Sequence, residues 1–274
     1  HVPFLLRCLA LVLVILVLAR PQTTNKWQNS EIEGIDIMLA IDVSTSMLAE
    51  DLKPNRLEAA KDVAAEFING RPNDNIGITL FAGETFTQCP LTVDHAVLLD
   101  MIHNIKCGLI TDGTAVGMGI ANAVTRLKDS KAKSKVIILL TDGTNNKGDI
   151  SPMTAAEIAK SFGIRVYTIG VGTNGMAPYP YPVGNTVQYV SMPVEIDEKT
   201  LTEIAGTTDG NYFRATSNSK LKEVYEEIDK LEKTKLNVKE YSKRDEEYHW
   251  FALAAFLCVL LEVLLRNSVL KKIP

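Results

Sequence analysis

The sequence predicts an α/β protein: a doubly wound, mostly parallel sheet with helices on both faces, flanked by two transmembrane helices. Two observations lead to this prediction. Short β-branched runs alternate with amphipathic stretches through the middle of the chain, which is typical of a parallel sheet. Both ends of the chain are much more apolar than the middle. With 274 residues, 46% of them hydrophobic, the chain can bury one sizeable core.

Four apolar runs in the middle of the chain are predicted as buried strands, because they are too short and too rich in β-branched residues for helices. These runs are 35–41, 76–81, 136–140 and 164–169. Amphipathic spacing predicts helices at 55–70, 94–105, 115–129 and 154–163. After residue 195, one more helix, a short strand near 211–215 and a closing helix complete the domain.

Residues 173–196 are rich in proline and tyrosine. The alternation in TVQYV predicts a β-hairpin or an extended loop at the carboxyl end of the strand 164–169. In a doubly wound sheet, that edge carries the ligand crevice. The segment is therefore either part of a functional site or a tolerated surface insertion.

The two apolar ends are predicted to cross a membrane. Residues 1–20 and 248–266 are largely apolar, and a bilayer core requires about 20 such residues. A cleaved signal peptide is the alternative for the first span, and a buried amphipathic helix is the alternative for the second. Because the chain begins with His1 instead of methionine, we expect a further segment before it.

The spans define the predicted domain organisation and its orientation. The predicted parts are a span at 1–20, a linker at 21–34, an α/β domain at 35–235, a linker at 236–247, a span at 248–266 and a tail at 267–274. Beyond the second span lie Arg266, Lys271 and Lys272, and basic residues favour the cytoplasmic side. The domain is therefore predicted to lie outside the cytoplasm.

One charged residue lies inside each predicted span, Arg7 in the first and Glu262 in the second. Charged side chains in a bilayer core are costly and tend to pair. Arg7 lies thirteen positions before Arg20, and Glu262 lies thirteen positions after His249, so an antiparallel hairpin places both at one depth, roughly 20 Å from the domain side. We therefore expect them to meet. The alternative is that each reaches the far headgroups separately.

Composition excludes some functions. A formal charge of −4 gives no broad basic surface, so the chain is not predicted to bind nucleic acid. The four cysteines include no C-x-x-C pair. Cys8 and Cys258 fall in the predicted spans, and Cys89 and Cys107 form either a disulfide or two buried thiols.

The sequence does not predict an enzyme. Residues 170–175, GVGTNG, match the dinucleotide-binding pattern G-x-G-x-x-G. The prolines of MAPYPYP directly after this pattern prevent the helix that the pattern requires. A metal-dependent hydrolase is the remaining enzymatic alternative, but no residue is a convincing general base for it.

Three polar residues occupy alternate positions at the end of the first buried strand: Asp42, Ser44 and Ser46. A strand that ends at the crevice can direct these side chains to one point. A carboxylate with neutral hydroxyls suits Mg²⁺, Ca²⁺ or Mn²⁺ and suits zinc or copper poorly. From this stretch alone, the serines are equally consistent with capping backbone amides before a helix.

Two further loops favour a metal site. The run LLTDGTNNKG ends another buried strand on Thr141 and Asp142. The run DGTAVGMGIANAV places Thr114 in a glycine-flanked turn before a helix. Because parallel strands bring their carboxyl ends to one edge of the sheet, we expect the three loops to meet there.

The combination of D-x-S-x-S, G-T-A and T-D-G in three loops strongly resembles the von Willebrand factor A domain. In that family, these loops form a metal-ion-dependent adhesion site. The resemblance implies that Ser44, Ser46 and Thr114 bind the ion through their hydroxyls. It also implies that Asp42 and Asp142 hold the ion directly or through water.

The resemblance covers roughly residues 36–230. Thr111 is the alternative to Thr114, which fits the G-T-A pattern better. The ion implied is a divalent cation, first of all Mg²⁺, with Ca²⁺ or Mn²⁺ as alternatives. The family further implies that the ion engages an acidic side chain of a protein partner.

A narrower resemblance connects the chain with the membrane-anchored BatA family of bacterial aerotolerance proteins. It rests on LARPQ, DVSTSMLAEDLKPNRLEAAK, FAGETFTQCPLT and GLITDGTAVG. It implies an adaptor or scaffold of a bacterial envelope complex in the inner membrane, with a periplasmic domain. Implied partners are sister proteins of the same type and a MoxR-type AAA+ ATPase. The alternative function is an adhesin that binds an external ligand.

Overall fold

The computed structural model describes residues 2–19, 22–23, 34–183, 186–239, 245–246 and 248–268. The chain divides into two compact units, one formed by His1–Glu31 with Glu240–Pro274 and the other by Ile32–Lys239. Most of the predicted linkers 21–34 and 236–247 lies outside the described residues, as does the end of the tail with Lys271 and Lys272.

The larger unit contains a six-stranded sheet with the order β4-β3-β2-β5-β6-β9. The two central strands, β2 (Asp36–Asp42) and β5 (Lys135–Thr141), pair in parallel and are buried almost throughout. The parallel sheet continues through β3 (Asn75–Phe81), β6 (Ile164–Val171) and β9 (Tyr212–Ala215). These five strands confirm the strands predicted from the sequence, with ends shifted by one or two residues.

A sixth strand, β4 (Thr85–Thr92), was not apparent in the sequence. It pairs antiparallel with β3 at the edge of the sheet, and Cys89 is its one buried residue. An edge strand has one neighbour and tolerates a proline such as Pro90. Its residues therefore lack the continuous apolar run that reveals the central strands.

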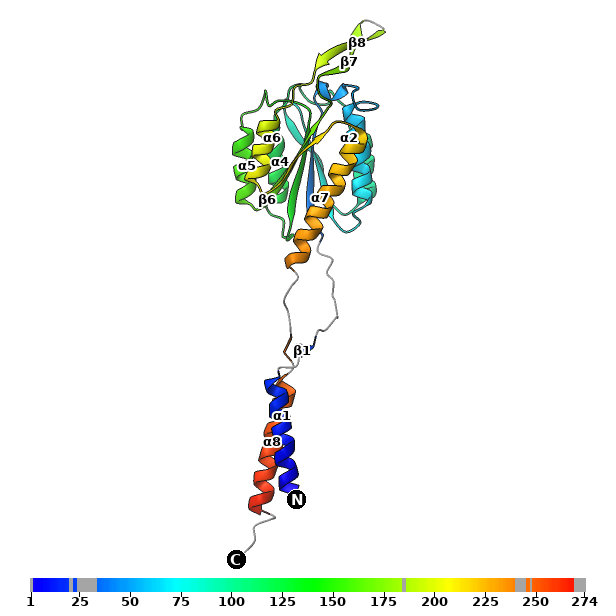
Figure 1. The fold of residues 1–274 in the computed structure, drawn as a ribbon. Coiled ribbons are helices and arrows are strands. Elements are labelled where there is room, and N and C mark those ends of the chain that lie inside the picture. Colours follow the sequence, from blue (N-terminus) through cyan, green and yellow to red (C-terminus); the bar gives the residue numbers. More distant parts are fainter. Residues whose placement is uncertain are drawn as a thin grey trace, which may run out of the picture. The chain divides into compact units, whose positions relative to one another are not determined.

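Helices cover both faces of the sheet, as predicted (Figure 1). One face carries α2 (Arg56–Asn69), α3 (His95–His103) and α7 (Asn218–Lys239). The other face carries α4 (Val116–Leu127), α5 (Pro152–Ser161) and α6 (Glu198–Thr207). Successive residues of β2 alternate between the two cores, because side chains of a strand alternate between its faces.

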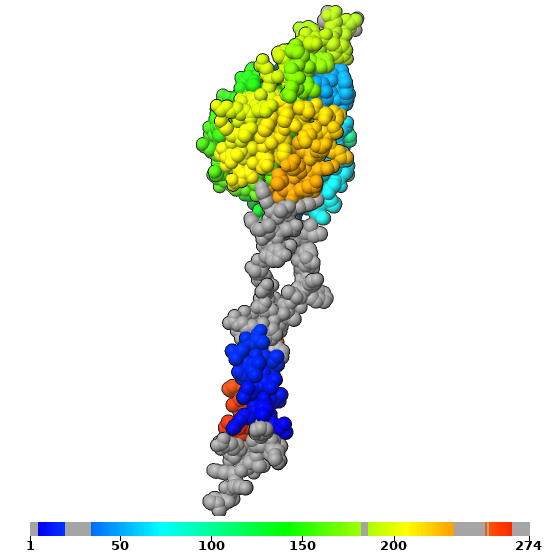
Figure 2. Space-filling model, viewed as in Figure 1, coloured from blue at the N-terminus to red at the C-terminus, as the bar shows by residue number. Residues whose placement is uncertain are grey.

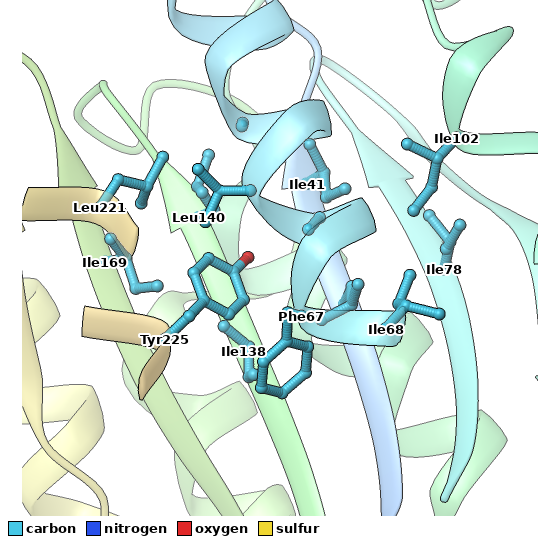
Figure 3. Close-up of a cluster of buried hydrophobic side chains, with 14 of the residues drawn as sticks. Ile41, Phe67, Ile68, Ile78, Ile102, Ile138, Leu140, Ile169, Leu221 and Tyr225 are labelled. Carbon is cyan, nitrogen blue, oxygen red and sulfur yellow. The ribbon is translucent and has the colours of Figure 1, made fainter. Parts of the chain in front are cut away.

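Figure 3 shows part of the core beneath α2 and α7. Ile41 and Leu140 from the central strands belong to one buried cluster with Phe67 of α2 and Tyr225 of α7. The rings of Phe67 and Tyr225 have centroids 4.9 Å apart. Fully burying one such large apolar side chain contributes about 1.5–3 kcal/mol. This packing fixes the strands and therefore the positions of the loops at their ends.

The predicted hairpin in 173–196 is present. It consists of β7 (Met176–Val183) and β8 (Thr186–Pro193), which pair antiparallel as a separate two-stranded sheet. The hairpin follows β6 and projects beyond the sheet and its helices (Figures 1 and 2). It therefore stands at the carboxyl end of the parallel strands.

The smaller unit contains two helices, α1 (Val2–Leu18) and α8 (Tyr248–Ser268), and a short antiparallel pair of β1 (Gln22–Thr23) with β10 (Asp245–Glu246). Most described apolar side chains of the two helices are exposed. Among the described residues, no helix combines the length and the apolar character needed to cross a membrane, so the two predicted spans are not confirmed.

Candidate metal centre

The carboxyl ends of the two central strands bring two carboxylates together. Asp42 is the last residue of β2, and Asp142 directly follows β5. Both side chains are almost completely buried, with residue exposures of 0% and 2%. Thr141 Oγ1 donates a hydrogen bond of 2.6 Å to Asp42 Oδ2, so the strand ends are also joined directly.

The serine hydroxyls extend this cluster. Ser44 Oγ and Ser46 Oγ lie 2.9 Å apart, and Ser46 Oγ donates to Asp142 Oδ1 over 2.7 Å. Ser44 N donates to Asp42 Oδ1 over 2.9 Å, which folds the chain back after the strand. Ser44 precedes the 3₁₀ helix η1 (Thr45–Leu48), but its side chain makes no capping bond there. The capping interpretation is therefore wrong for Ser44.

Thr114 lies against the loop that carries Asp142. A Cβ on Gly143 would lie 3.3 Å from Thr114 Oγ1, so this glycine lets the hydroxyl approach closely. Thr114 N donates to Asn146 Oδ1 over 2.9 Å, and Asn146 N donates back to Thr114 O over 3.0 Å. Thr111 is exposed and donates to Glu84 Oε1 over 3.4 Å. The structure thus places Thr114 at the cluster and Thr111 outside it.

A second contact ties the Thr114 loop to the serine loop. Asp112 accepts two hydrogen bonds from Thr45, one from its backbone N (3.0 Å) and one from Oγ1 (2.8 Å). These bonds lower the pKa of Asp112, although its partial burial acts in the opposite direction. All three loops are therefore linked pairwise before any ligand is considered.

Arg56 is a residue of the site that sequence reasoning missed. It is the first residue of α2, whose start is capped by the side chain of Asn55 accepting from Glu58 N. Its guanidinium is buried and donates to Asp142 Oδ2 over 2.7 Å. It also donates two bonds of 2.7 Å to Asp51. A cation is unfavourable at a helix N-terminus. The position of Arg56 at the start of α2 was therefore the one feature of the sequence that could have pointed to a special role for it.

The cluster carries an excess of negative charge. The guanidinium of Arg56 pairs with Asp51 and Asp142, and the described ion pairs give Asp42 no cation. Burial, together with the charge of Asp142, raises the pKa of Asp42 to about 7. Burial also raises the pKa of Asp142, although Arg56 opposes this shift. An added cation would stabilise the ionised form of both carboxylates.

A cavity of about 260 Å³ lies between this cluster and the hairpin. Ser46, Ala49 and Arg56 line one side, and hairpin residues including Tyr179 and Tyr181 line the other. A larger cavity of about 320 Å³ lies between α2 and α7 and contains none of these loop residues. The crevice beside the candidate site is therefore formed partly by the hairpin.

The thiols take no part in a bridge. Cys89 and Cys107 are both free. Cys107 Sγ donates to Ser44 O over 3.4 Å, and burial followed by the charge of Asp42 raises the pKa of Cys107 to about 12. Such a thiol stays protonated and is a poor metal ligand.

The ligand set must depend on hydroxyls. In the part of the chain that the structure describes, no group of three His, Cys, Asp or Glu side chains is placed to hold a metal ion. The cluster instead combines two carboxylates with the hydroxyls of Ser44, Ser46 and Thr114. An all-oxygen set with excess negative charge fits a hard divalent cation.

The fold and this arrangement of loops define a class of protein. Residues 36–227 match the von Willebrand factor type A domain, and the chain belongs to that family. It is 28% identical over 267 residues to an uncharacterized protein of Borreliella burgdorferi, covering 97% of this chain and 78% of that protein. It is 32% identical over 241 residues to a UPF0353 protein of Mycolicibacterium paratuberculosis, covering 82% of this chain and 68% of that protein.

Solved structures agree with this assignment. BatB from Bacteroides thetaiotaomicron is 34% identical and has a TM-score of 0.64. The match covers 73% of this chain and 100% of the BatB chain. An aerotolerance-related membrane protein from Bacteroides fragilis is also 34% identical, with a TM-score of 0.63 over 72% of this chain and all of its own. Proximal thread matrix protein 1 of the mussel byssus is 25% identical and has a TM-score of 0.57; the match covers 72% of this chain and 45% of that protein. That protein holds zinc in its MIDAS motif, the metal-ion-dependent adhesion site.

Proposed function

We propose that the chain is a protein-interaction module whose binding depends on a divalent metal ion. The observation that carries this proposal is the continuous cluster of Ser44, Ser46, Asp142 and Asp42 beside an open cavity. The three loops that form it come from residues far apart in the sequence and are tied together by side-chain hydrogen bonds. These bonds gather the oxygen ligands at one place before an ion binds.

The residues that would hold the ion are Ser44, Ser46, Thr114, Asp42 and Asp142. Both oxygens of Asp42 already accept hydrogen bonds, from Ser44 N and Thr141 Oγ1, so its charge can act through the serines or through water. A bound ion would supply positive charge that attracts a carboxylate oxygen of another protein. The oxygen donors favour Mg²⁺, with Ca²⁺ or Mn²⁺ as alternatives, although a relative holds zinc.

The chain's own residues orient the site. Arg56 holds Asp142 and Asp51 on opposite sides of its guanidinium, so the carboxylate of Asp142 is fixed before an ion binds. Asp51 Oδ2 also accepts from Thr173 N over 2.8 Å, just before the hairpin. The lining of the cavity by Tyr179 and Tyr181 supports a role of the hairpin in selecting the partner.

We further propose that the module works at a bacterial inner membrane as an adaptor of an envelope complex, held there by α1 and α8 with its domain in the periplasm. Two observations support this location. Large apolar side chains of α1 and α8 are exposed, among them Leu5, Leu18 and Phe256. A relative at 34% identity is an aerotolerance-related membrane protein. Sister proteins of this type and a MoxR-type AAA+ ATPase are the proposed partners.

Affinity capture tests the proposed function. The full chain is solubilised in detergent and used to capture proteins in Mg²⁺ or in a chelator, followed by mass spectrometry. Proteins that bind through the site should be lost in the chelator and with Thr114→Ala. They should be retained with Thr111→Ala, which removes a hydroxyl from a neighbouring position outside the cluster. Capture that is equally strong in the chelator would rule out metal-dependent binding.

A further inference from the structure

The outer edge of β7 is blocked against further strand pairing. Three prolines, Pro178, Pro180 and Pro182, occupy alternate positions in this strand and have no backbone N–H. Pro178 O accepts from Glu50 N over 2.9 Å, so the backbone of Pro178 faces away from β8. Because N–H and C=O of one residue point to the same side in an antiparallel strand, all three prolines face outward. The outer edge of β7 therefore offers no donors at these positions.

The same alternation leaves the outer edge of β8 open. The residues opposite the three prolines are Ser191, Tyr189 and Val187. They form the non-hydrogen-bonded pairs of the hairpin, so their N–H and C=O groups also point outward. The bond from Val194 N to Gly175 O, 2.8 Å long, fixes the same alternation at the base of the hairpin.

The described backbone hydrogen bonds include none to the outward groups of Val187, Tyr189 and Ser191. All eight residues of β8 are exposed. The hydroxyl of Tyr189 donates to Glu50 Oε1 over 3.1 Å, but its backbone groups have no described partner. Three consecutive outward positions thus present three donors and three acceptors to solvent.

This edge lacks the protection that exposed strands normally carry. Proteins blunt open edges with lysine, proline, bulges or a covering element. In the hairpin, residues 176–193 include no charged side chain, although 23% of the whole chain is charged. Val187 and Tyr189 are 57% and 61% exposed. One edge of the hairpin is blocked by proline, and the other edge remains available.

We propose that the open edge of β8 pairs antiparallel with the same edge of a second copy of this chain. A twofold axis at Tyr189 places Tyr189 opposite its copy and Val187 opposite Ser191. All six outward backbone groups of each strand then find partners. The contact stretch is neutral, so two negatively charged chains meet there without repulsion between side chains.

The blocked edge of β7 limits this assembly to two copies. The intermolecular sheet has four strands in the order β7-β8-β8-β7, and both of its outer edges carry prolines. The contact is isologous and closed, so it does not continue into fibres. A hairpin edge buries much less than the roughly 1,600 Å² of a standard interface, so the dimer is weak and depends on concentration.

The test uses the full chain and two variants of one residue. Ser191→Pro removes an outward N–H that the hairpin itself does not use, whereas Ser191→Ala keeps that N–H. Photo-oxidative cross-linking should join Tyr189 to Tyr189 of the second copy in the wild type and in Ser191→Ala. In Ser191→Pro the yield of this dityrosine should fall at least tenfold. Mass spectrometry of the linked peptides identifies the site, which separates this contact from association through α1 and α8.

Hydrogen exchange supplies an independent readout. The outward amides of Val187, Tyr189 and Ser191 should exchange more slowly as the concentration of the chain rises, and this dependence should vanish in Ser191→Pro. Val187→Pro changes the other end of the edge and should also abolish the concentration dependence. Two proline variants at different positions keep the test valid if one of them perturbs the hairpin. Replacing Pro178, Pro180 and Pro182 together by alanine restores the missing donors of the second edge and should produce species larger than a dimer.

Exchange at residues 186–193 that is independent of concentration would overturn the proposal. So would a dityrosine link at Tyr189 that survives in both proline variants. Protection of the β8 amides that appears only when a different protein is added would show another occupant and would equally exclude the second copy.

Discussion

Arg7 Nη2 lies 2.6 Å from Glu262 Oε1 and joins α1 to α8. Glu262 is buried, with a residue exposure of 8%, in a helix pair whose other described side chains are mostly apolar. The sequence predicts this contact from two charges at equal distances from the ends of an antiparallel hairpin, and the structure confirms it. The ion pair therefore places Arg7 and Glu262 at the same level of the two helices.

The Arg7–Glu262 pair should show energetic coupling. Arg7→Leu and Glu262→Leu should each lower the free energy of unfolding of the helix pair. The loss in the double variant should be smaller than the sum of the two single losses by about 0.5 kcal/mol or more. Unfolding of the full chain in detergent measures the three values. The exchanged variant Arg7→Glu with Glu262→Arg should recover part of the lost stability. Strictly additive losses would show that the contact has no energetic role.

Thr114→Ala should weaken Mg²⁺ binding, whereas the matched variant Thr111→Ala should leave it unchanged. The reason is that the structure places Thr114 beside the loop of Asp142 and Thr111 on the surface. Removing one ligand hydroxyl should cost on the order of 1–2 kcal/mol, which is about tenfold in the dissociation constant. Titration calorimetry on the detergent-solubilised chain gives both constants. Equal constants for the two variants would count against the assignment of Thr114.

Mg²⁺ binding should also weaken as the pH falls. Because the pKa of Asp42 in the ion-free site is raised to about 7, a proton occupies this carboxyl below that pH. The ion must displace the proton, so affinity should be constant above pH 8 and should decline below pH 7. Calorimetry in buffers of different ionisation enthalpy should detect proton release near pH 6 and none near pH 9. Affinity that does not change across this range would contradict the raised pKa.

Arg56→Met should destabilise the domain strongly. The guanidinium pairs with the carboxylates of Asp51 and Asp142, whose side chains are 3% and 0% exposed, and its loss leaves two carboxylates without a cation. Breaking a buried pair from one side typically costs about 3–5 kcal/mol. The melting temperature of the full chain should fall, and added Mg²⁺ should recover part of the loss. Lys222→Met, which removes an exposed pair with Glu66, is the control and should change stability by less than about 0.5 kcal/mol.

Acid should loosen α7 through Glu232. Burial of this carboxylate raises its pKa. Hydrogen bonds from Arg165, Tyr167 and Ser134 lower the pKa by a larger amount, so the net shift is downward. A carboxyl with a depressed pKa contributes stability above its unfolded pKa, which for Glu is about 4.3, and loses it as the pH falls through its folded value. Stability should therefore decline below about pH 4. Glu232→Gln should be less stable at pH 7 and should show a smaller decline, as measured by denaturant unfolding at each pH.

The hairpin should affect partner binding without affecting the ion. Deleting 176–188 removes Tyr179 and Tyr181 from the lining of the cavity but leaves Ser46 and Arg56 in place. Capture of Mg²⁺-dependent partners should fall severalfold while the affinity for Mg²⁺ stays within about twofold. Loss of ion binding in this variant would indicate that the hairpin supports the loops directly, through Asp51 and Thr173.

The sequence by itself determined the alternation of strands and helices and the positions of the three loops. Both follow from local rules: buried strands are continuous apolar runs, and parallel strands deliver their ends to one edge. For this reason Asp42, Ser44, Ser46, Thr114 and Asp142 could be placed at one edge in advance. The pairing of Arg7 with Glu262 followed from counting residues along two helices.

Only the tertiary structure decided which side chains complete the cluster and which edge of the hairpin stays open. Arg56 meets Asp142 across more than 80 residues of intervening chain, and no local period encodes such a contact. The edge strand β4 carried too little apolar pattern to be recognised. The direction of the prolines in β7 depends on the register with β8, which the bond from Glu50 to Pro178 revealed. Contacts between distant segments are set by packing of the whole domain, which a local pattern does not contain.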